Sequence, residues 1–164
     1  MTRALALLLF LTLGGCGLRP LYADGASGNI ATSLSTIQIA PIPERAGWLV
    51  RNALVDRLGG EPSNPVYRLE VELDDDVTAF GIRGDSAVTR ERRTLRARYR
   101  LVNLASGEVV LDATAGSDAG IDVVSSEYAT VAAEQSAQER LAQVIADQMV
   151  SRLALFMQRR AQGQ

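Results

Sequence analysis

The sequence predicts an α+β fold: a two-layer sandwich in which two α-helices pack on one face of a roughly four-stranded mixed or antiparallel sheet. The first observation is the alternation of apolar and charged residues over residues 66–77 and 89–104, which is typical of strands with one wet face. The second is apolar spacing of three and four residues over residues 44–58 and 126–160, which indicates two amphipathic helices. A sheet and two helices that each have one apolar face bury those faces by packing together.

The start of the chain has the composition of an export signal. Arg3 supplies a positive charge, residues 4–13 are an almost unbroken apolar run, and Gly14 and Gly15 are the small residues that a signal peptidase accepts. The apolar run is too short to cross a bilayer core, which takes about 20 helical residues. Residues 1–15 are therefore predicted to be a cleaved signal peptide.

The cysteine that follows carries a second signal. Leu13-Gly14-Gly15-Cys16 resembles the bacterial lipobox, in which a lipid is attached to the cysteine after cleavage. A chance cysteine behind an ordinary signal is the alternative. The next residue is Gly17, whereas an aspartate there commonly marks retention in the inner membrane. The resemblance implies a lipid anchor on Cys16 in the outer membrane, on its periplasmic side.

The segments before the first long strand follow from glycine and proline positions. Residues 16–33 are expected to be the lipidated N-terminus and a flexible tether, because residues 23–33 are small, polar and contain glycine. Residues 34–42 predict a first strand that ends at a pair of prolines, Pro41 and Pro43. The helix over residues 44–58 starts after Pro43 and stops at two glycines.

The remaining elements complete a single domain over residues 34–160. A turn signal, Arg83-Gly-Asp, joins the two long strands, and residues 108–116 are expected to be the last strand of a meander. The closing helix opens at Ser126 and runs to about residue 160, with residues 161–164 as a disordered tail. Its expected buried stripe contains Leu141, Val144, Ile145, Gln148, Arg152, Leu155 and Phe156.

The most unusual feature of the mature chain is a row of arginines on one strand face: Arg90, Arg92, Arg96, Arg98 and Arg100. One interpretation is cross-strand pairing in a hairpin, where these side chains meet Glu70, Glu72, Asp74 and Asp76. The other is anion binding, because a guanidinium matches phosphate with two parallel hydrogen bonds. The basic excess lies toward the turn, so Arg90, Arg92 and Arg93 are the candidates for an anionic ligand.

The composition argues against catalysis and against nucleic-acid binding. The chain has no histidine and one cysteine, so the usual nucleophile–base pairs are missing once Cys16 is lipidated. The mature chain is mildly acidic, which predicts no bulk attraction to nucleic acid. Asp74 and Asp76 share one strand face, yet two carboxylates are a thin ligand set for Ca²⁺, which takes about 6–8 oxygens. We expect no enzyme, no metal site and no cofactor.

Four segments resemble the LPS-assembly lipoproteins of the LptE family, especially the alphaproteobacterial type. They are Cys16-Gly-Leu-Arg-Pro-Leu-Tyr22, the proline-ended strand Ile39-Ala-Pro-Ile-Pro43, the helix Arg51-Asn-Ala-Leu-Val-Asp-Arg-Leu58, and the long closing helix around Ser126-Glu-Tyr-Ala-Thr130 and Leu141 to Phe156. The resemblance implies a plug in the lumen of the LptD β-barrel that helps this barrel to assemble and binds lipopolysaccharide near basic residues. Arg90, Arg92 and Arg93 are candidates for that contact by location only. The alternative is an outer-membrane lipoprotein that serves as an accessory subunit of another transport complex.

Overall fold

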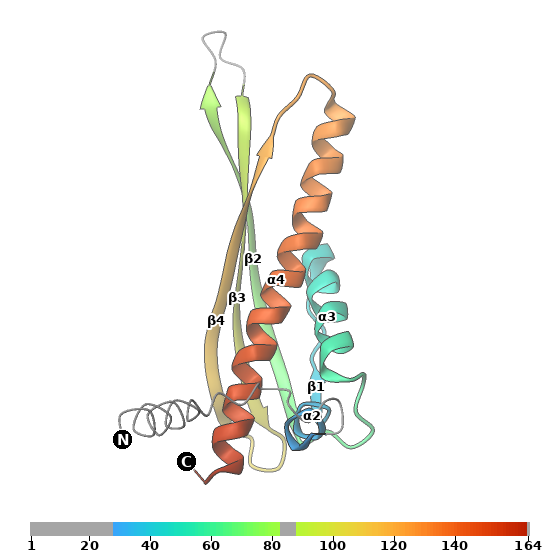
Figure 1. Cartoon of the computed structure of the whole chain (residues 1–164), viewed down its shortest axis with the longest axis vertical. Helices are drawn as coiled ribbons and strands as arrows, with labels where there is room; N and C mark the ends of the chain where they lie inside the picture. The colour runs from blue at the N-terminus through green and yellow to red at the C-terminus, as the bar shows by residue number, and fades with distance from the viewer. Residues whose placement is uncertain (1–27, 83–87, 164) are drawn as a thin grey trace, which may run out of the picture.

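The computed structural model describes residues 28–82 and 88–163 and confirms the predicted α+β fold. Its strands form one mixed sheet in the order β1-β2-β3-β4, with β1 parallel to β2 and the other neighbours antiparallel. The two long helices lie on the same face of this sheet (Figure 1). In chain order the elements are α2 (Asn29–Leu34), β1 (Ile37–Ile39), α3 (Glu44–Leu58), β2 (Tyr67–Ile82), β3 (Val88–Asn103), β4 (Val109–Asp122) and α4 (Glu127–Ala161).

Alternation within β2 and β3 separates an apolar face from a charged face, because successive side chains of a strand point to opposite sides. Leu69, Leu95 and Leu101 point toward the helices and are fully buried. On the outer face, the register sets acidic residues of β2 opposite basic residues of β3: Glu70 with Arg100, Glu72 with Arg98, and Asp74 with Arg96. This register confirms the hairpin that the sequence predicted.

The helix α3 begins and ends where the sequence predicted. Pro43 precedes it with extended backbone, and Gly59 ends it in the left-handed conformation (φ 92°), where its N–H donates to the carbonyl of Val55. A left-handed residue at a helix end favours glycine because glycine has no Cβ. Near the start of α3, a Cβ on Gly47 would lie 2.6 Å from the carbonyl oxygen of Ile42. The helix therefore packs directly on the segment that leads out of β1.

The predicted boundaries are wrong at both ends of the sheet. Residues 29–34 were expected to end the tether and begin the first strand, but they form α2, which leaves β1 only Ile37–Ile39. The last strand continues past residue 116 to Asp122. The sequence did not predict this part because, of the inward-pointing residues Ser117, Ala119 and Ile121, only Ile121 has a large side chain. The signal peptide, the rest of the tether, Cys16 and the turn at 83–85 lie outside the described residues.

The long helix α4 matches the predicted length but only part of the predicted stripe. Val144, Gln148, Arg152 and Leu155 were expected inside and are exposed. Burial of Leu141 and Ile145 is confirmed, but from there the buried stripe continues through Met149, Leu153 and Met157, flanked by Ala142, Ala146 and Ala154. Methionine and alanine carry weaker apolar signals than valine and leucine, which shifted the prediction around the helix. In the described part of the chain, no helix is both long and apolar enough to cross a membrane.

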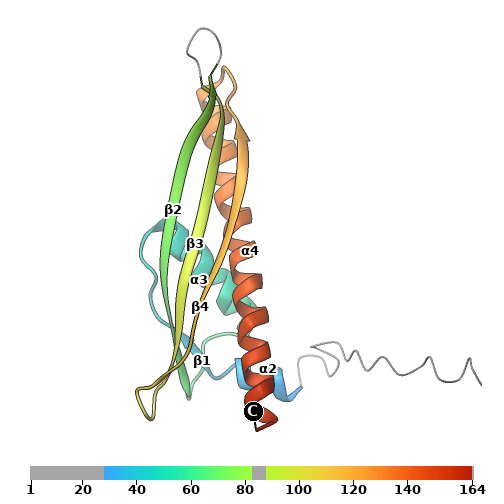
Figure 2. The ribbon, with the colours of Figure 1, turned by 90° about the vertical axis from the view of Figure 1, so that its left-hand side faces the viewer.

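The two helices cover different lengths of the sheet. Figures 1 and 2 show α4 running along almost the whole height of the strands, whereas α3 covers only the part near β1 and α2. We call the part beside α3 the base; its strand residues are 67–73, 97–103 and 109–115. We call the rest of the sheet the distal half; it comprises strand residues 74–82, 88–96 and 116–122 and is accompanied by residues 127–140 of α4.

Candidate functional site

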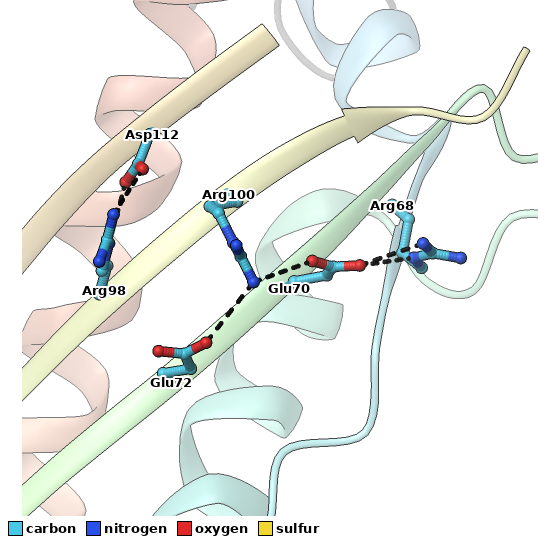
Figure 3. A network of polar contacts seen from close by, with 6 residues as sticks. All are labelled: Arg68, Glu70, Glu72, Arg98, Arg100 and Asp112. Carbon is cyan, nitrogen blue, oxygen red and sulfur yellow. Dashed lines mark hydrogen bonds and ion pairs between the residues drawn. The ribbon is translucent and has the colours of Figure 1, made fainter. Parts of the chain in front are cut away.

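Ion pairs cross the outer face of the base from β2 to β4 (Figure 3). Arg100 lies 3.5 Å from a carboxylate oxygen of Glu70 and 3.5 Å from one of Glu72. Glu70 also accepts a hydrogen bond of 3.1 Å from Arg68. These contacts tie oppositely charged side chains of β2 and β3 together, as one of the two interpretations of the sequence predicted.

The same network reaches β4 through Arg98 and Asp112. Two nitrogens of the Arg98 guanidinium donate to the two carboxylate oxygens of Asp112, at 3.3 and 2.9 Å. These hydrogen bonds and the opposite charges raise the pKa of Arg98 and lower the pKa of Asp112. Both side chains are exposed, so water and salt screen the pair. This face therefore carries many charged side chains but a net charge close to zero. The ion pairs add little to the free energy of unfolding.

The outer face of the distal half carries the arginines that the sequence singled out. Arg90 lies 3.3 Å from Asp122, and Arg92 lies 4.0 Å from Asp118, both across to β4. The guanidinium of Arg92 also stands 5.3 Å from the centre of the Phe80 ring, at the distance of a cation–π contact. The side chains of Arg90 and Arg92 are 65% and 58% exposed, so most of their donors face solvent.

Arg93, the third candidate, lies on the opposite face of the sheet. Two of its nitrogens donate to the two oxygens of Asp75, at 2.8 and 2.6 Å, and the Gln138 amide of α4 donates to Asp75 at 2.8 Å. The Arg93 and Asp75 side chains are only 15% and 11% exposed. Burial acts to raise the pKa of Asp75, but the hydrogen bonds from Arg93 and Gln138 and the charge of Arg93 outweigh it and lower the pKa.

An open groove of about 610 Å³ crosses the outer face between the base and the distal half. Gly116 of β4 has no side chain to fill it, and Arg96 extends across it, with a guanidinium nitrogen 3.2 Å from where a Cβ of Gly116 would stand. Asp74 lines the groove opposite. Arg96 makes no ion pair within the described residues, so it is the least neutralised arginine of the outer row there.

The structure therefore divides the predicted site. Arg90 and Arg92 share the outer face and remain accessible, whereas Arg93 is held by Asp75 beneath α4. Strand alternation already carries this signal, because neighbours in a strand point to opposite faces. Sequence reasoning assigned Arg96 to the acidic strand, and its position opposite Asp74 is confirmed, but no ion pair forms there. Cys16 lies outside the described residues.

A family model matches most of the chain, and solved structures share its fold. The family model described as LptE, lipopolysaccharide-assembly, matches residues 34–153. An uncharacterized protein of Rickettsia prowazekii is 25% identical over 154 residues, which cover 94% of this chain and 96% of that protein. A chain described as a lipoprotein of Caulobacter crescentus is 27% identical, with a TM-score of 0.68 over 81% of this chain and 98% of that one. Rare lipoprotein B of Shewanella oneidensis has the same fold at 9% identity, with a TM-score of 0.57 over 72% and 92% of the two chains.

Proposed function

Because the chain belongs to the LptE family of lipopolysaccharide-assembly proteins, we propose that it is an outer-membrane lipoprotein that plugs and helps to assemble the LptD β-barrel. The observation that carries the proposal is the extent of the family match. Residues 34–153 include every strand, all of α3 and most of α4, so the match covers the whole sandwich rather than one motif. The role is a structural one, with no reaction assigned to the chain.

The anchor is the first part of this proposal. Cys16, preceded by Leu13-Gly14-Gly15, carries the lipid, and the domain begins close behind it at α2. One acyl chain holds a protein only weakly, whereas several together make a stable anchor. We expect Cys16→Ser to abolish labelling of the protein by a radioactive fatty acid. Label retained by the serine variant would contradict the assignment of Cys16.

The plug role is supported by the charged outer face. The lumen of an outer-membrane barrel is polar, so a sheet face covered with paired charges can lie against it without desolvating an apolar patch. Arg98, Arg100 and Asp112 present such a face on the base. Depletion of the protein should lower the amount of correctly assembled barrel and of surface lipopolysaccharide together. Normal levels of both after depletion would refute the plug role.

Contact with lipopolysaccharide is proposed at the distal outer face, through Arg90 and Arg92. Each makes one carboxylate contact, at 3.3 and 4.0 Å, which leaves further guanidinium donors for phosphate groups. Phe80 beside Arg92 adds an apolar surface that suits an amphiphile. Arg93 is not part of this contact, because it lies on the inner face and donates to both carboxylate oxygens of Asp75.

The matched test compares Arg92→Glu with Arg98→Glu. Both replace an exposed outer-face arginine of β3, but Arg98 is paired with Asp112 in the base. We expect Arg92→Glu to weaken lipopolysaccharide binding by about tenfold, the loss of one charge-assisted contact, and Arg98→Glu to leave it nearly unchanged. Equal loss in both folded variants would contradict the division between the two regions.

A further inference from the structure

Within the described residues, the long middle part of β2 has no neighbouring strand on one side. The short strand β1 pairs only with Tyr67, Arg68 and Leu69, although β2 runs on to Ile82. The chain leaves β1 through Ala40 and two prolines and then enters α3. Prolines have no N–H to continue a ladder. Among the described residues, β2 is therefore a free edge of the sheet from Leu73 to Ala79, in agreement with the position of β2 at the margin of the sheet in Figure 2.

The hydrogen bonds at the start of β2 determine which of its backbone groups face this edge. The carbonyl of Val66 accepts from the N–H of Leu104, so even-numbered residues of β2 bond to β3. The carbonyl of Leu69 accepts from the N–H of Ala40 on the other side. The antiparallel pairing continues without a register shift up to the Phe80–Arg90 pair. The N–H and C=O groups of Leu73, Asp75, Val77 and Ala79 therefore point away from the sheet.

The two flanks of this edge differ from each other in chemistry. On the helix side, Val77 is 41% exposed and Ala79 is exposed, because α3 covers only the base. On the outer side, Glu72, Asp74 and Asp76 stand two residues apart along the strand. Asp74 and Asp76 make no ion pair within the described part of the chain. An extended segment beside this edge would meet Leu73, Val77 and Ala79 on one face, where the Asp75 carboxylate is already bound by Arg93, and carboxylates on the other.

The second free edge, along β4, is partly closed by the protein itself. The Gln148 side chain of α4 accepts from the N–H of Gly116 at 3.1 Å and donates to its carbonyl at 3.3 Å. The helix α4 thus occupies the backbone groups in the middle of that edge. Exposed edges normally carry covers or bulges of this kind, since unpaired strands invite pairing. Between Leu73 and Ala79, no described residue plays this part for β2.

We propose that residues 73–79 of β2 are a strand-addition site, which takes an extended segment of the barrel partner in which basic and apolar residues alternate. The alternation follows from the carboxylates on one flank and the apolar side chains on the other. The inference rests on the proposed plug function and adds the place and the chemistry of one contact. The bound segment would lie beside β2 in line with β1, as an extension of the edge strand, and would bury Val77 and Ala79.

The test uses the lipidated full chain, purified with its barrel partner from membranes. Val77→Pro removes an N–H that points to the free edge, and Gly120→Pro removes the equivalent N–H on the β4 edge, four residues beyond Gly116. We expect Val77→Pro to lower the recovered barrel by about tenfold or more, as loss of a central contact does, while Gly120→Pro leaves recovery unchanged. Asp74→Lys with Asp76→Lys, which leaves the backbone intact, should lower recovery as well, because it repels a basic segment.

Each outcome has one meaning. Normal recovery of the barrel with both Val77→Pro and the lysine variant overturns the strand-addition site and leaves the plug function standing. A wild-type chain that recovers no barrel overturns the plug function, and this inference with it. A photo-crosslinking residue at position 79 should yield an adduct with the barrel. An adduct with a second copy of this chain, or with its own residues 16–27, would overturn the proposed occupant.

Discussion

The base and the distal half are built from the same three strands but are covered differently. In the base, α3 and α4 both pack on the sheet, and side chains such as Leu54, Leu69 and Met149 are fully buried. In the distal half only α4 is present, and the buried side chains among the described residues are Leu95, Ile121, Ala137 and Gln138. The base therefore contains most of the hydrophobic core, whereas the distal half extends the sheet and leaves more of its surface exposed.

Different interactions organise the two parts. Burial of apolar area stabilises the base by roughly 25 cal/mol per Å². The distal half instead has the Asp75–Arg93 pair with Gln138, which joins β2, β3 and α4. A desolvated ion pair contributes little net free energy compared with apolar packing, but it fixes which residues meet. The ion pair thus fixes how the strands and α4 meet in the distal half, but it contributes less to the free energy of unfolding than the apolar core of the base does.

The largest expected effect is the loss of an apolar side chain from the base. Leu69→Ala leaves a cavity at a fully buried site between β1 and β3, which should lower the free energy of unfolding by roughly 2–5 kcal/mol. Val77→Ala in the distal half should change it by less than about 0.5 kcal/mol, because Val77 is exposed. Urea unfolding measures both. Similar losses at the two sites would erase the distinction between the base and the distal half.

The next effect tests the distal ion pair. Asp75→Ala leaves Arg93 desolvated without its partner, which should cost about 2 kcal/mol, less than the roughly 3–5 kcal/mol of a fully buried pair. The double variant Asp75→Leu with Arg93→Leu should recover most of this loss, and thermal unfolding compares the two. If the double variant is as unstable as Asp75→Ala, the loss does not come from the unpaired charge.

The same pair predicts a dependence on pH. The folded-state pKa of Asp75 is lowered, so its stabilising contribution is complete above about pH 4, the unfolded value, and is lost as the pH falls through the folded-state pKa. Wild-type protein should therefore lose more stability than Asp75→Asn over this acidic range. Unfolding free energies of both proteins, measured from neutral pH downward, provide the check, and parallel curves would contradict it.

Two glycine substitutions, one in each part, should have smaller effects on stability. Gly47→Ala places a methyl group 2.6 Å from the Ile42 carbonyl in the base, so α3 must shift, at a cost of about 1–2 kcal/mol. Gly120→Ala in β4 meets open space within 4 Å. Its effect should be near zero or slightly stabilising. Equal thermal midpoints for the two variants would show that α3 is not closely packed on the Ile42 segment.

The smallest effect is expected on the outer face. Arg98→Ala breaks the bidentate contact with Asp112, yet both groups are exposed, and the unfolding midpoint should not change measurably. Its visible consequence is on the partner: the pKa of Asp112, which Arg98 lowers, should rise toward its ordinary value. Carboxyl chemical shifts followed through an acid titration measure that change, and an unchanged Asp112 pKa would refute the pairing in solution.

The sequence predicted the architecture well because the long strands and α3 have strong periodic signals. Alternation over β2 and β3 placed Leu69 and Arg98 on the correct faces, and glycine at position 59 marked the end of α3. The end of β4 was missed because residues 116–122 are mostly small or acidic and have low strand propensity. The short helix α2 has too few residues for a periodic pattern to emerge.

The candidate site was only partly predictable. The basic excess toward the distal turn was visible in the sequence, and alternation separates Arg92 from Arg93. The partner of Arg93 was not visible, because it depends on the register that brings Asp75 near it and on the packing of α4 that brings Gln138 to Asp75. Ion pairs across to β4 likewise required a strand whose length the sequence did not reveal.

The position of α4 at the end of the chain sets the order in which the molecule can fold. This helix supplies Leu141, Ile145, Met149 and Leu153 to the core, yet all four lie in the final quarter of the sequence. A chain threaded through a narrow pore from its N-terminus would deliver the whole meander before this helix arrives. Until then only α3 could cover the apolar side of β2, β3 and β4, so much of that side would be exposed to water and prone to aggregate. The meander therefore keeps part of its apolar face exposed until α4 has formed and packed on it.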